Sequence, residues 1–289
     1  MVGMATIEIA GVPHAYTLTP ARHPNAPVLV FVHGWLLSRS YWEPAIARLS
    51  PDYQCLSYDL RGFGDSAVGA GSGYALVDYA RDLKQLLQQL AIDRAWLIGH
   101  SLGGSIALWG AKTCPERVAG VICVNAGGGI YLEEEFDRFR STGEQLVRRR
   151  PRWLPYVPFL DRVFARAMVA RPLARRWGRQ RLLDFVKADT QAALGALLDS
   201  TTENEVHLLP QLVSQLEQPA YFLAGERDAI MELQYVRHLA SFHSSFGCCG
   251  DNTISIPNCG HLAMVEQPDT VVAIVRRLLD CHQAERDGR

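Results

Sequence analysis

The segment Gly99-His100-Ser101-Leu102-Gly103 carries the residues that most directly indicate chemistry in this chain. It follows the apolar, strand-like run 95–98 and precedes a helix-like segment. A serine with G-x-S-x-G spacing at a strand-to-helix turn has the context of a nucleophile elbow, which leaves only the serine hydroxyl exposed. Side chains two positions before and after the serine would collide with neighbouring backbone, so both positions need glycine. The pattern predicts that Ser101 is a nucleophile.

A serine hydroxyl is a weak nucleophile at neutral pH, so a base must take its proton. Histidine suits this role because it changes charge near neutral pH. We predict that the base is His261, which lies in a Gly-containing loop after a strand-like run. His100 lies inside the elbow and is expected to pack beneath the turn. The base needs a carboxylate to hold its tautomer, and Asp228, just beyond the strand-like run 220–224, suits this role, with Glu226 as the neighbouring alternative.

The alternation of short β-rich runs with helix-like segments predicts an α/β fold. Continuous apolar runs such as 28–32 and 121–124 are typical of strands buried on both faces, so we expect a mostly parallel sheet covered by helices. The expected strands are 6–9, 15–18, 27–33, 54–59, 95–99, 118–125, 220–224 and 253–257, the first two forming an antiparallel hairpin. The expected helices include 40–49, 76–90, 101–113 and 268–277.

One segment, from about residue 127 to about residue 216, interrupts this alternation with helical patterns and proline breaks. It is too long for a crossover connection and too apolar for a disordered linker. We therefore predict a core made of residues 1–126 and 217–289, with residues 127–216 inserted as a helical cap.

The predicted cap is rich in arginine. Between Arg148 and Arg181 the sequence holds eleven arginines and a single acid, Asp161, interleaved with aromatic and aliphatic residues. One interpretation is a solvated arginine face over an apolar face that packs on the core. The other is a surface that makes peripheral contact with an anionic membrane or attracts an anionic substrate. The sequence leaves both open.

Composition restricts the classes of function and the compartment. The 289 residues are 48% apolar and carry a net charge of −1, which argues against a general nucleic-acid binder. Seven cysteines, an odd number without a C-x-x-C pair, favour a reducing compartment. The N-terminus lacks a signal-peptide pattern, and no apolar run is long enough to span a bilayer. We therefore expect a cytoplasmic protein.

Neither a metal nor an organic cofactor is predicted. Five potential metal ligands lie close together in the sequence: His243, Cys248, Cys249, Cys259 and His261. Their spacing fits none of the usual zinc patterns, and the Cys248-Cys249 loop has no functional interpretation. The glycines of 61–66 and 69–73 do not form a strand-led G-x-G-x-x-G, so no nicotinamide or flavin is implied. We interpret 61–66 as loop architecture.

Four motifs occur in one order along the chain: His33-Gly34-Trp35, the segment 59–66, the elbow and Gly260-His261. Together they resemble the α/β-hydrolase superfamily over residues 26–279. The resemblance implies an eight-stranded, mostly parallel sheet flanked by helices, with the cap inserted. It also implies the nucleophile, acid and histidine order Ser101, Asp228, His261. By the same resemblance, the backbone amides of Trp35 and Leu102 form the oxyanion hole.

Serine as the nucleophile favours acyl chemistry, because the haloalkane dehalogenases and epoxide hydrolases that resemble this frame carry aspartate there. The resemblance therefore implies a serine hydrolase that cleaves a small-molecule carboxylic ester or thioester through an acyl-enzyme. Carbon–carbon bond hydrolases, cofactor-free peroxidase-like members and acyltransferases remain open, as does hydrolysis of a long-chain lipid or phytyl ester at a membrane. A small-molecule receptor or regulatory protein without turnover is the alternative from a different class.

Overall fold

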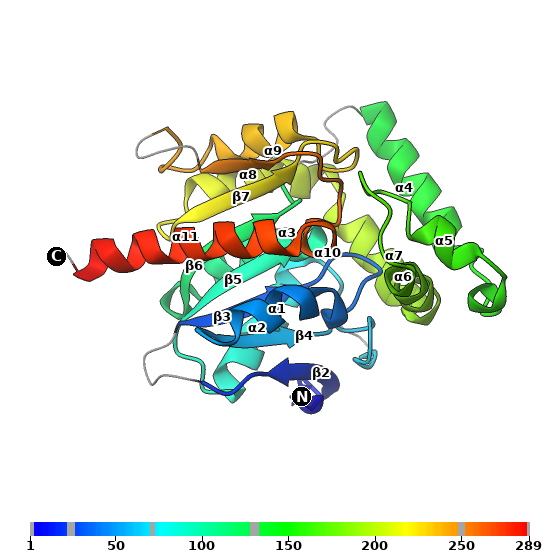
Figure 1. Cartoon of the computed structure of the whole chain (residues 1–289), viewed down its shortest axis with the longest axis horizontal. Coiled ribbons are helices and arrows are strands. Elements are labelled where there is room, and N and C mark those ends of the chain that lie inside the picture. Colours follow the sequence, from blue (N-terminus) through cyan, green and yellow to red (C-terminus); the bar gives the residue numbers. More distant parts are fainter. Residues whose placement is uncertain (1–2, 22–26, 70–72, 128–132, 248–251, 288–289) are drawn as a thin grey trace.

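A single eight-stranded sheet forms the centre of the computed structural model, which describes residues 3–21, 27–69, 73–127, 133–247 and 252–287. The strand order is β1-β2-β4-β3-β5-β6-β7-β8 (Figure 1). The strands are β1 (Ala5–Ile9), β2 (Val12–Leu18), β3 (Val28–Val32), β4 (Gln54–Tyr58), β5 (Ala95–His100), β6 (Val118–Val124), β7 (Ala220–Gly225) and β8 (Thr253–Ile256). All eight predicted strands are present, with ends that differ by a few residues.

The sheet is mixed but mostly parallel, as predicted. β1 and β2 form the expected antiparallel hairpin, and β2 also pairs antiparallel with β4. The strands from β4 to β8 along the sheet are parallel. Their carboxyl ends meet at one edge of the sheet, which is where α/β folds place their binding sites.

Helices cover both faces of the sheet. Successive residues of β3 point to opposite faces, so Val30 joins one buried cluster and Phe31 the other. One cluster includes α2 (Leu76–Gln89), α3 (Leu102–Thr113), α8 (Glu203–Ser214) and α9 (Leu233–Ala240). The other includes α1 (Glu43–Leu49), α10 (Ala263–Glu266) and α11 (Pro268–Asp287). The elements that carry candidate site residues therefore rest on a core packed from both sides.

Two predicted helices differ from the observed ones. The helix expected over 40–49 is divided into a 3₁₀ turn, η1 (Arg39–Trp42), and α1. Pro44 explains the division, because proline lacks an N–H and fits only in the first turn of an α-helix. The last helix, expected over 268–277, continues to Asp287 as α11.

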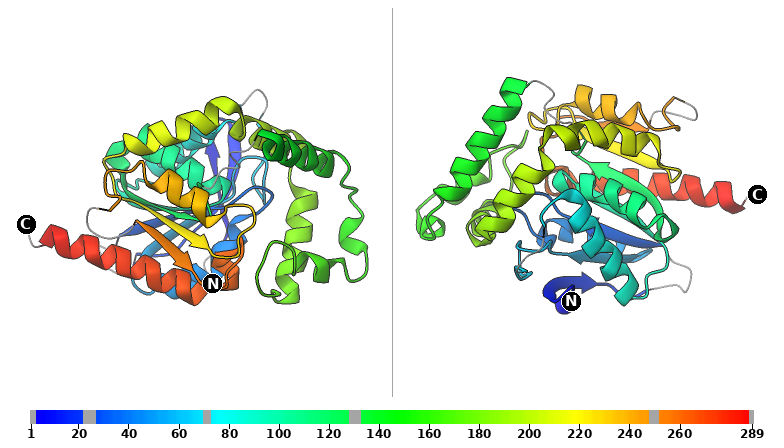
Figure 2. Two further views of the ribbon diagram at one scale, coloured as in Figure 1. Left: turned by 90° about the horizontal axis from the view of Figure 1, so that it is seen from above. Right: turned by 180° about the vertical axis from the view of Figure 1, so that it is seen from behind.

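The described chain between β6 and β7 consists of helices joined by turns and loops, without a strand. Its helices are α4 (Glu133–Arg148), η3 (Leu154–Tyr156), α5 (Leu160–Phe164), α6 (Arg175–Lys187), α7 (Thr190–Ser200) and α8. We call the described residues 133–214 the helical insertion. Its α4 to α6 lie to one side of the sheet in Figures 1 and 2, whereas α8 packs against α3 and α9. The predicted cap boundaries at 127 and 216 stay predictions. In the described part of the chain, no helix is long and apolar enough to cross a membrane.

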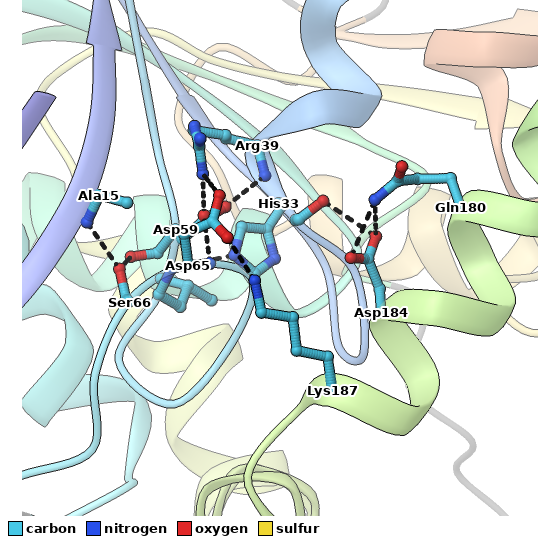
Figure 3. Close-up of polar contacts among 11 residues, drawn as sticks. Ala15, His33, Arg39, Asp59, Asp65, Ser66, Gln180, Asp184 and Lys187 are labelled. Carbon is cyan, nitrogen blue, oxygen red and sulfur yellow. Dashed lines mark hydrogen bonds and ion pairs between the residues drawn. The ribbon is translucent and has the colours of Figure 1, made fainter. Parts of the chain in front are cut away.

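The loop after β4 is held by the buried carboxylate of Asp59 (Figure 3). This carboxylate accepts the backbone N–H groups of Arg39 at 2.6 Å and Asp65 at 2.8 Å, and it pairs with the Arg39 guanidinium. The Asp59 carbonyl accepts the Ser66 hydroxyl at 2.7 Å. These contacts support the interpretation of 61–66 as loop architecture.

Two polar contacts join α6 of the insertion to the core (Figure 3). The Lys187 ammonium pairs with the Asp65 carboxylate. Asp184, which is buried, accepts the Ser38 hydroxyl at 2.9 Å and the Gln180 amide at 3.0 Å. Burial raises the pKa of Asp184 to about 6, more than its hydrogen bonds lower it.

This raised pKa gives a stability prediction. Because Asp184 binds its proton more tightly in the folded state than in the unfolded state, its contribution to stability is fully present below the unfolded pKa of 3.8 and declines as pH rises to about 6. A shift of about two units corresponds to about 3 kcal/mol. Asp184→Asn keeps an acceptor for Ser38 without the charge. We expect the variant to gain about 2 kcal/mol relative to wild type between pH 4 and pH 7, measured by urea unfolding at both pH values. A difference that does not change with pH would contradict this.

Candidate active site

Ser101 lies at a sharp turn between β5 and α3. Its backbone angles, φ 51° and ψ −121°, fall in a region that non-glycine residues rarely adopt. A methyl group on Gly99 would overlap the carbonyl oxygen of Gly103, and one on Gly103 would overlap the carbonyl oxygen of Val32. The close approach of backbone on both sides of Ser101 therefore requires glycine at both positions.

His261 and Asp228 come together from the loops after β8 and β7. His261 Nδ1 donates to Asp228 Oδ2 at 2.8 Å, a tautomer assigned from this contact. The other carboxylate oxygen, Oδ1, accepts the backbone N–H groups of Ile230 at 2.8 Å and Met231 at 3.0 Å. Burial would raise the pKa of Asp228, but the charge and hydrogen bond of His261, with the two amides, lower it to about 2. Asp228 is thus ionised at neutral pH and fixes the orientation of the imidazole through its Nδ1 atom.

Glu226, the alternative acid, does not contact His261. It is exposed, and its carboxylate accepts the backbone N–H of Asn258 at 3.3 Å. Of the two predicted carboxylates, the structure brings only Asp228 to the histidine.

Asn125 is a site residue that the sequence interpretation only excluded as the acid, because an amide carries no charge, and to which it gave no other role. It follows β6 and is fully buried. Its side-chain amide donates to Asp228 Oδ2 at 2.8 Å and to the carbonyl of Gly260 at 3.1 Å. One side chain thereby joins the acid to the loop that carries His261. The signal available in the sequence was its position directly after an apolar strand, at the same sheet edge as Ser101.

We expect Asn125→Leu to lower kcat about tenfold or more through misplacement of Asp228 and His261. The leucine is similar in size but donates no hydrogen bond, so the carboxylate and the Gly260 carbonyl each lose a partner, at a cost of about 1–3 kcal/mol per buried group. Steady-state kinetics on an ester and thermal unfolding would measure the two effects. An unchanged kcat would show that Asn125 does not position the pair.

His100 holds the backbone of His261 from beneath the elbow. Its Nε2 donates to the His261 carbonyl at 2.7 Å, and the two rings lie 4.8 Å apart. Burial, aided by the charge of His261, lowers the pKa of His100 to about 3, so its ring stays neutral. From the other side, the His261 N–H donates to the carbonyl of Met168 in the insertion at 2.8 Å. The loop of His261 is therefore fixed by both the core and the insertion.

The predicted oxyanion residues, Trp35 and Leu102, line the same cavity as Ser101. Trp35 follows β3, and Leu102 is the first residue of α3. The loop of Trp35 is fixed by His33, whose Nδ1 donates to the Gly34 carbonyl at 2.8 Å and whose Nε2 accepts the Leu60 N–H at 2.9 Å. Both ring nitrogens of His33 therefore hold backbone, which gives it a structural role.

These residues border a cavity of about 570 Å³ between the sheet edge and the insertion. Ser101, His261, Trp35 and Leu102 all line it, and Asp228 lies behind His261. Most of the other lining side chains are apolar: Leu36, Leu37, Leu76, Phe139, Leu146, Val163, Phe164, Ala167, Met168, Phe185, Leu197, Val206, Leu209, Ile230, Met231 and Leu262. The site therefore joins a nucleophile, a base and an acid to a pocket suited to an apolar molecule.

Charged side chains are rare in this cavity. Among the described lining residues, Arg181 is the single arginine or lysine. Its guanidinium is already used by the carbonyls of Phe164 and Ala167. Glu205 lines the cavity too, and it accepts the Trp109 indole N–H at 3.2 Å. Burial raises the pKa of Glu205.

The potential metal ligands are not gathered into a site in the part of the chain that the structure describes. No group of three histidine, cysteine, aspartate or glutamate side chains with metal-binding geometry occurs there. The ring nitrogens of His243 contact the Ser245 hydroxyl and the Gln218 carbonyl, and His261 contacts Asp228. Cys248 and Cys249 lie outside the described residues. The expectation of no metal stays a prediction.

Comparison with known proteins agrees with this architecture. A family model described as the alpha/beta hydrolase fold matches residues 27–268. The chain belongs to this family.

Two kinds of relative are informative. The chain is 30% identical over 269 residues to a 2-succinyl-6-hydroxy-2,4-cyclohexadiene-1-carboxylate synthase of Enterobacter sp. (strain 638), covering 90% of this chain and 95% of that protein. Among solved structures, it is similar to an esterase from Thermogutta terrifontis, with a TM-score of 0.76, 24% identity and coverage of 96% and 98%. An enol-lactonase from Burkholderia xenovorans gives a TM-score of 0.77, 21% identity and coverage of 96% and 100%. The structural likenesses bear on the fold alone.

Proposed function

We propose that this α/β hydrolase cleaves carboxylic esters, or thioesters, with Ser101 as nucleophile. His261 takes the Ser101 proton as the hydroxyl attacks the carbonyl carbon, and it then protonates the leaving alcohol or thiol. An acyl-enzyme remains, and a water molecule activated by His261 releases the carboxylic acid. The amides of Trp35 and Leu102 stabilise the oxyanion. The observation that carries the proposal is that His261 lines one cavity with Ser101 and is hydrogen-bonded to Asp228 behind it.

The cavity favours substrates with a sizeable apolar part. Its volume of about 570 Å³ exceeds what a short acetyl ester fills, and most of its lining side chains are apolar. Burying apolar substrate surface contributes about 25 cal/mol per Å². We therefore expect kcat/KM to rise with acyl chain length.

A second candidate rests on the relatives named as synthases, whose named product is a carboxylate that bears a succinyl group. A pocket for such an anion needs cationic or donor groups that are free to bind it. Among the described lining residues, Arg181 is the single arginine or lysine. Its guanidinium already donates to the backbone carbonyls of Phe164 and Ala167. The lining therefore favours an apolar ester over the synthase reaction.

One experiment separates these functions. Turnover of p-nitrophenyl esters from short to long acyl chains is measured with and without the product named for the synthases. The proposal predicts many turnovers, a preference for the longer chains and weak inhibition by that product. No turnover with tight product binding would favour the synthase, and single-turnover binding of an ester would favour a receptor.

A further inference from the structure

The segment around η3 and α5 exposes large apolar side chains. Tyr156 is 85% exposed, Trp153 62% and Phe159 60%, and Val163 is exposed to a similar degree. We call these four residues the aromatic edge. Neighbouring residues of the same segment, Leu154 and Phe164, pack against the buried core instead. In Figures 1 and 2 this segment forms the outer margin of the molecule, away from the sheet. An exposed apolar cluster of this kind marks an interaction surface.

Arginines are frequent in the sequence on both sides of the aromatic edge. Five of them are exposed and form no ion pair with any residue that the structure describes: Arg149, Arg152, Arg166, Arg171 and Arg179. Another, Arg162, stacks on the Phe159 ring at 4.9 Å. The nearest acid in sequence, Asp161, is already paired with Arg175. The edge therefore combines exposed rings with uncompensated positive charge, which is the composition of surfaces that bind anionic lipid interfaces.

The aromatic edge is continuous with the mouth of the catalytic cavity. Val163 belongs to the edge and also lines the cavity, and the exposed side chains of Leu146 and Met168 line the cavity as well. Met168 also contacts the active site directly, because its carbonyl accepts the His261 N–H at 2.8 Å. If a surface binds at the aromatic edge, a molecule that leaves this surface would therefore enter an apolar cavity next to Ser101.

We propose that the aromatic edge docks on an anionic lipid surface and opens the catalytic cavity toward it. The rings enter the interfacial region of the bilayer, and the arginines that flank the edge in the sequence contact the lipid phosphates and carboxylates. The substrates are then esters with long apolar chains that reside in the membrane. This substrate class rests on the proposed hydrolase function, whereas docking itself does not require catalysis.

Vesicle binding tests the docking. Wild-type protein is mixed with vesicles of phosphatidylcholine alone or of phosphatidylcholine with phosphatidylserine, and the bound fraction is measured by co-sedimentation. We expect strong binding only to the anionic vesicles, weakened by salt. Trp153→Ser/Tyr156→Ser should weaken binding at least about tenfold, because both rings lose their burial in lipid. Arg152→Gln/Arg166→Gln should weaken it roughly 25-fold, at about 1 kcal/mol for each charge.

Matched variants outside the insertion serve as controls. Phe242→Ser removes another exposed ring, and Arg94→Gln removes another exposed cation. Both should bind anionic vesicles as wild type does. Equal loss of binding in the control variants would overturn the proposal, as would wild type that does not bind anionic vesicles. A third contradicting result would be that Trp153→Ser/Tyr156→Ser converts an oligomer in solution to a monomer without changing vesicle binding. The edge would then contact a second copy of this chain.

A water-soluble short ester keeps the two proposals apart. The edge variants should turn it over at the wild-type rate, because they leave Ser101 and His261 unchanged. If wild-type protein turns over this ester but does not bind anionic vesicles, the docking proposal alone is overturned. Vesicle binding by a protein whose ester turnover is insensitive to Ser101→Ala overturns the hydrolase proposal alone.

Discussion

Replacement of Ser101 by alanine is expected to abolish ester turnover, with a loss in kcat on the order of 10⁶. The alanine keeps the backbone turn but provides no oxygen to form the acyl-enzyme. Steady-state release of p-nitrophenol measures the effect. Since the substitution removes one half-buried oxygen and leaves Gly99 and Gly103 unchanged, the free energy of unfolding should stay within about 1 kcal/mol of wild type.

Ser105 provides the matched control for this substitution. It lies on α3, one turn beyond Ser101, and lines the same cavity. Ser105→Ala should keep kcat within a fewfold of wild type. Turnover that survives Ser101→Ala, or that disappears equally in Ser105→Ala, would show that the nucleophile has been assigned to the wrong residue.

Asp228→Asn is expected to lower kcat by a factor on the order of 10⁴, with a smaller change in KM. Every described group around the Asp228 carboxylate donates to it: His261, Asn125 and the amides of Ile230 and Met231. An asparagine has one oxygen and one NH₂ group, so its NH₂ must face one of these donors. With the oxygen toward the two backbone amides, the NH₂ faces His261 Nδ1 and favours the tautomer that cannot take the Ser101 proton.

The pH dependence and a control variant test this explanation. Asp228 holds its charge down to a pKa of about 2, so its ionisation should not contribute to the acidic limb of kcat/KM above pH 4. Glu226→Gln should leave turnover unchanged, because the Glu226 carboxylate contacts Asn258 and not His261. A loss in Glu226→Gln as large as in Asp228→Asn would contradict the assignment of the acid.

Features fixed by local sequence could be predicted. The strand β3 and residues 95–98 of β5 are continuously apolar because both faces of these strands are buried, which makes them recognisable from sequence alone. The elbow is recognisable for a similar reason, since its tight turn permits only glycine at Gly99 and Gly103. From these two constraints the sequence predicts Ser101 at the carboxyl edge of a parallel sheet.

Features that depend on neighbouring strands could not be predicted. Asn125 supports Asp228 because β6 and β7 are adjacent in the sheet, although the two residues lie about a hundred positions apart in sequence. The arginine-rich, aromatic segment was recognisable, but which of its side chains are exposed could not be predicted, for a different reason. Its elements, η3 and α5, are too short for hydrophobic periodicity to show that Leu154 points inward and Tyr156 outward.

The most direct test of the proposed mechanism is to trap the acyl-enzyme. The protein is mixed with a p-nitrophenyl ester, quenched in acid during the first turnover, digested and mapped by mass spectrometry. The acyl group should be found on the peptide that contains Ser101, and it should accumulate at the rate of the p-nitrophenol burst. Multiple turnovers without any acylated peptide, or an acyl group on a different residue, would contradict nucleophilic catalysis by Ser101.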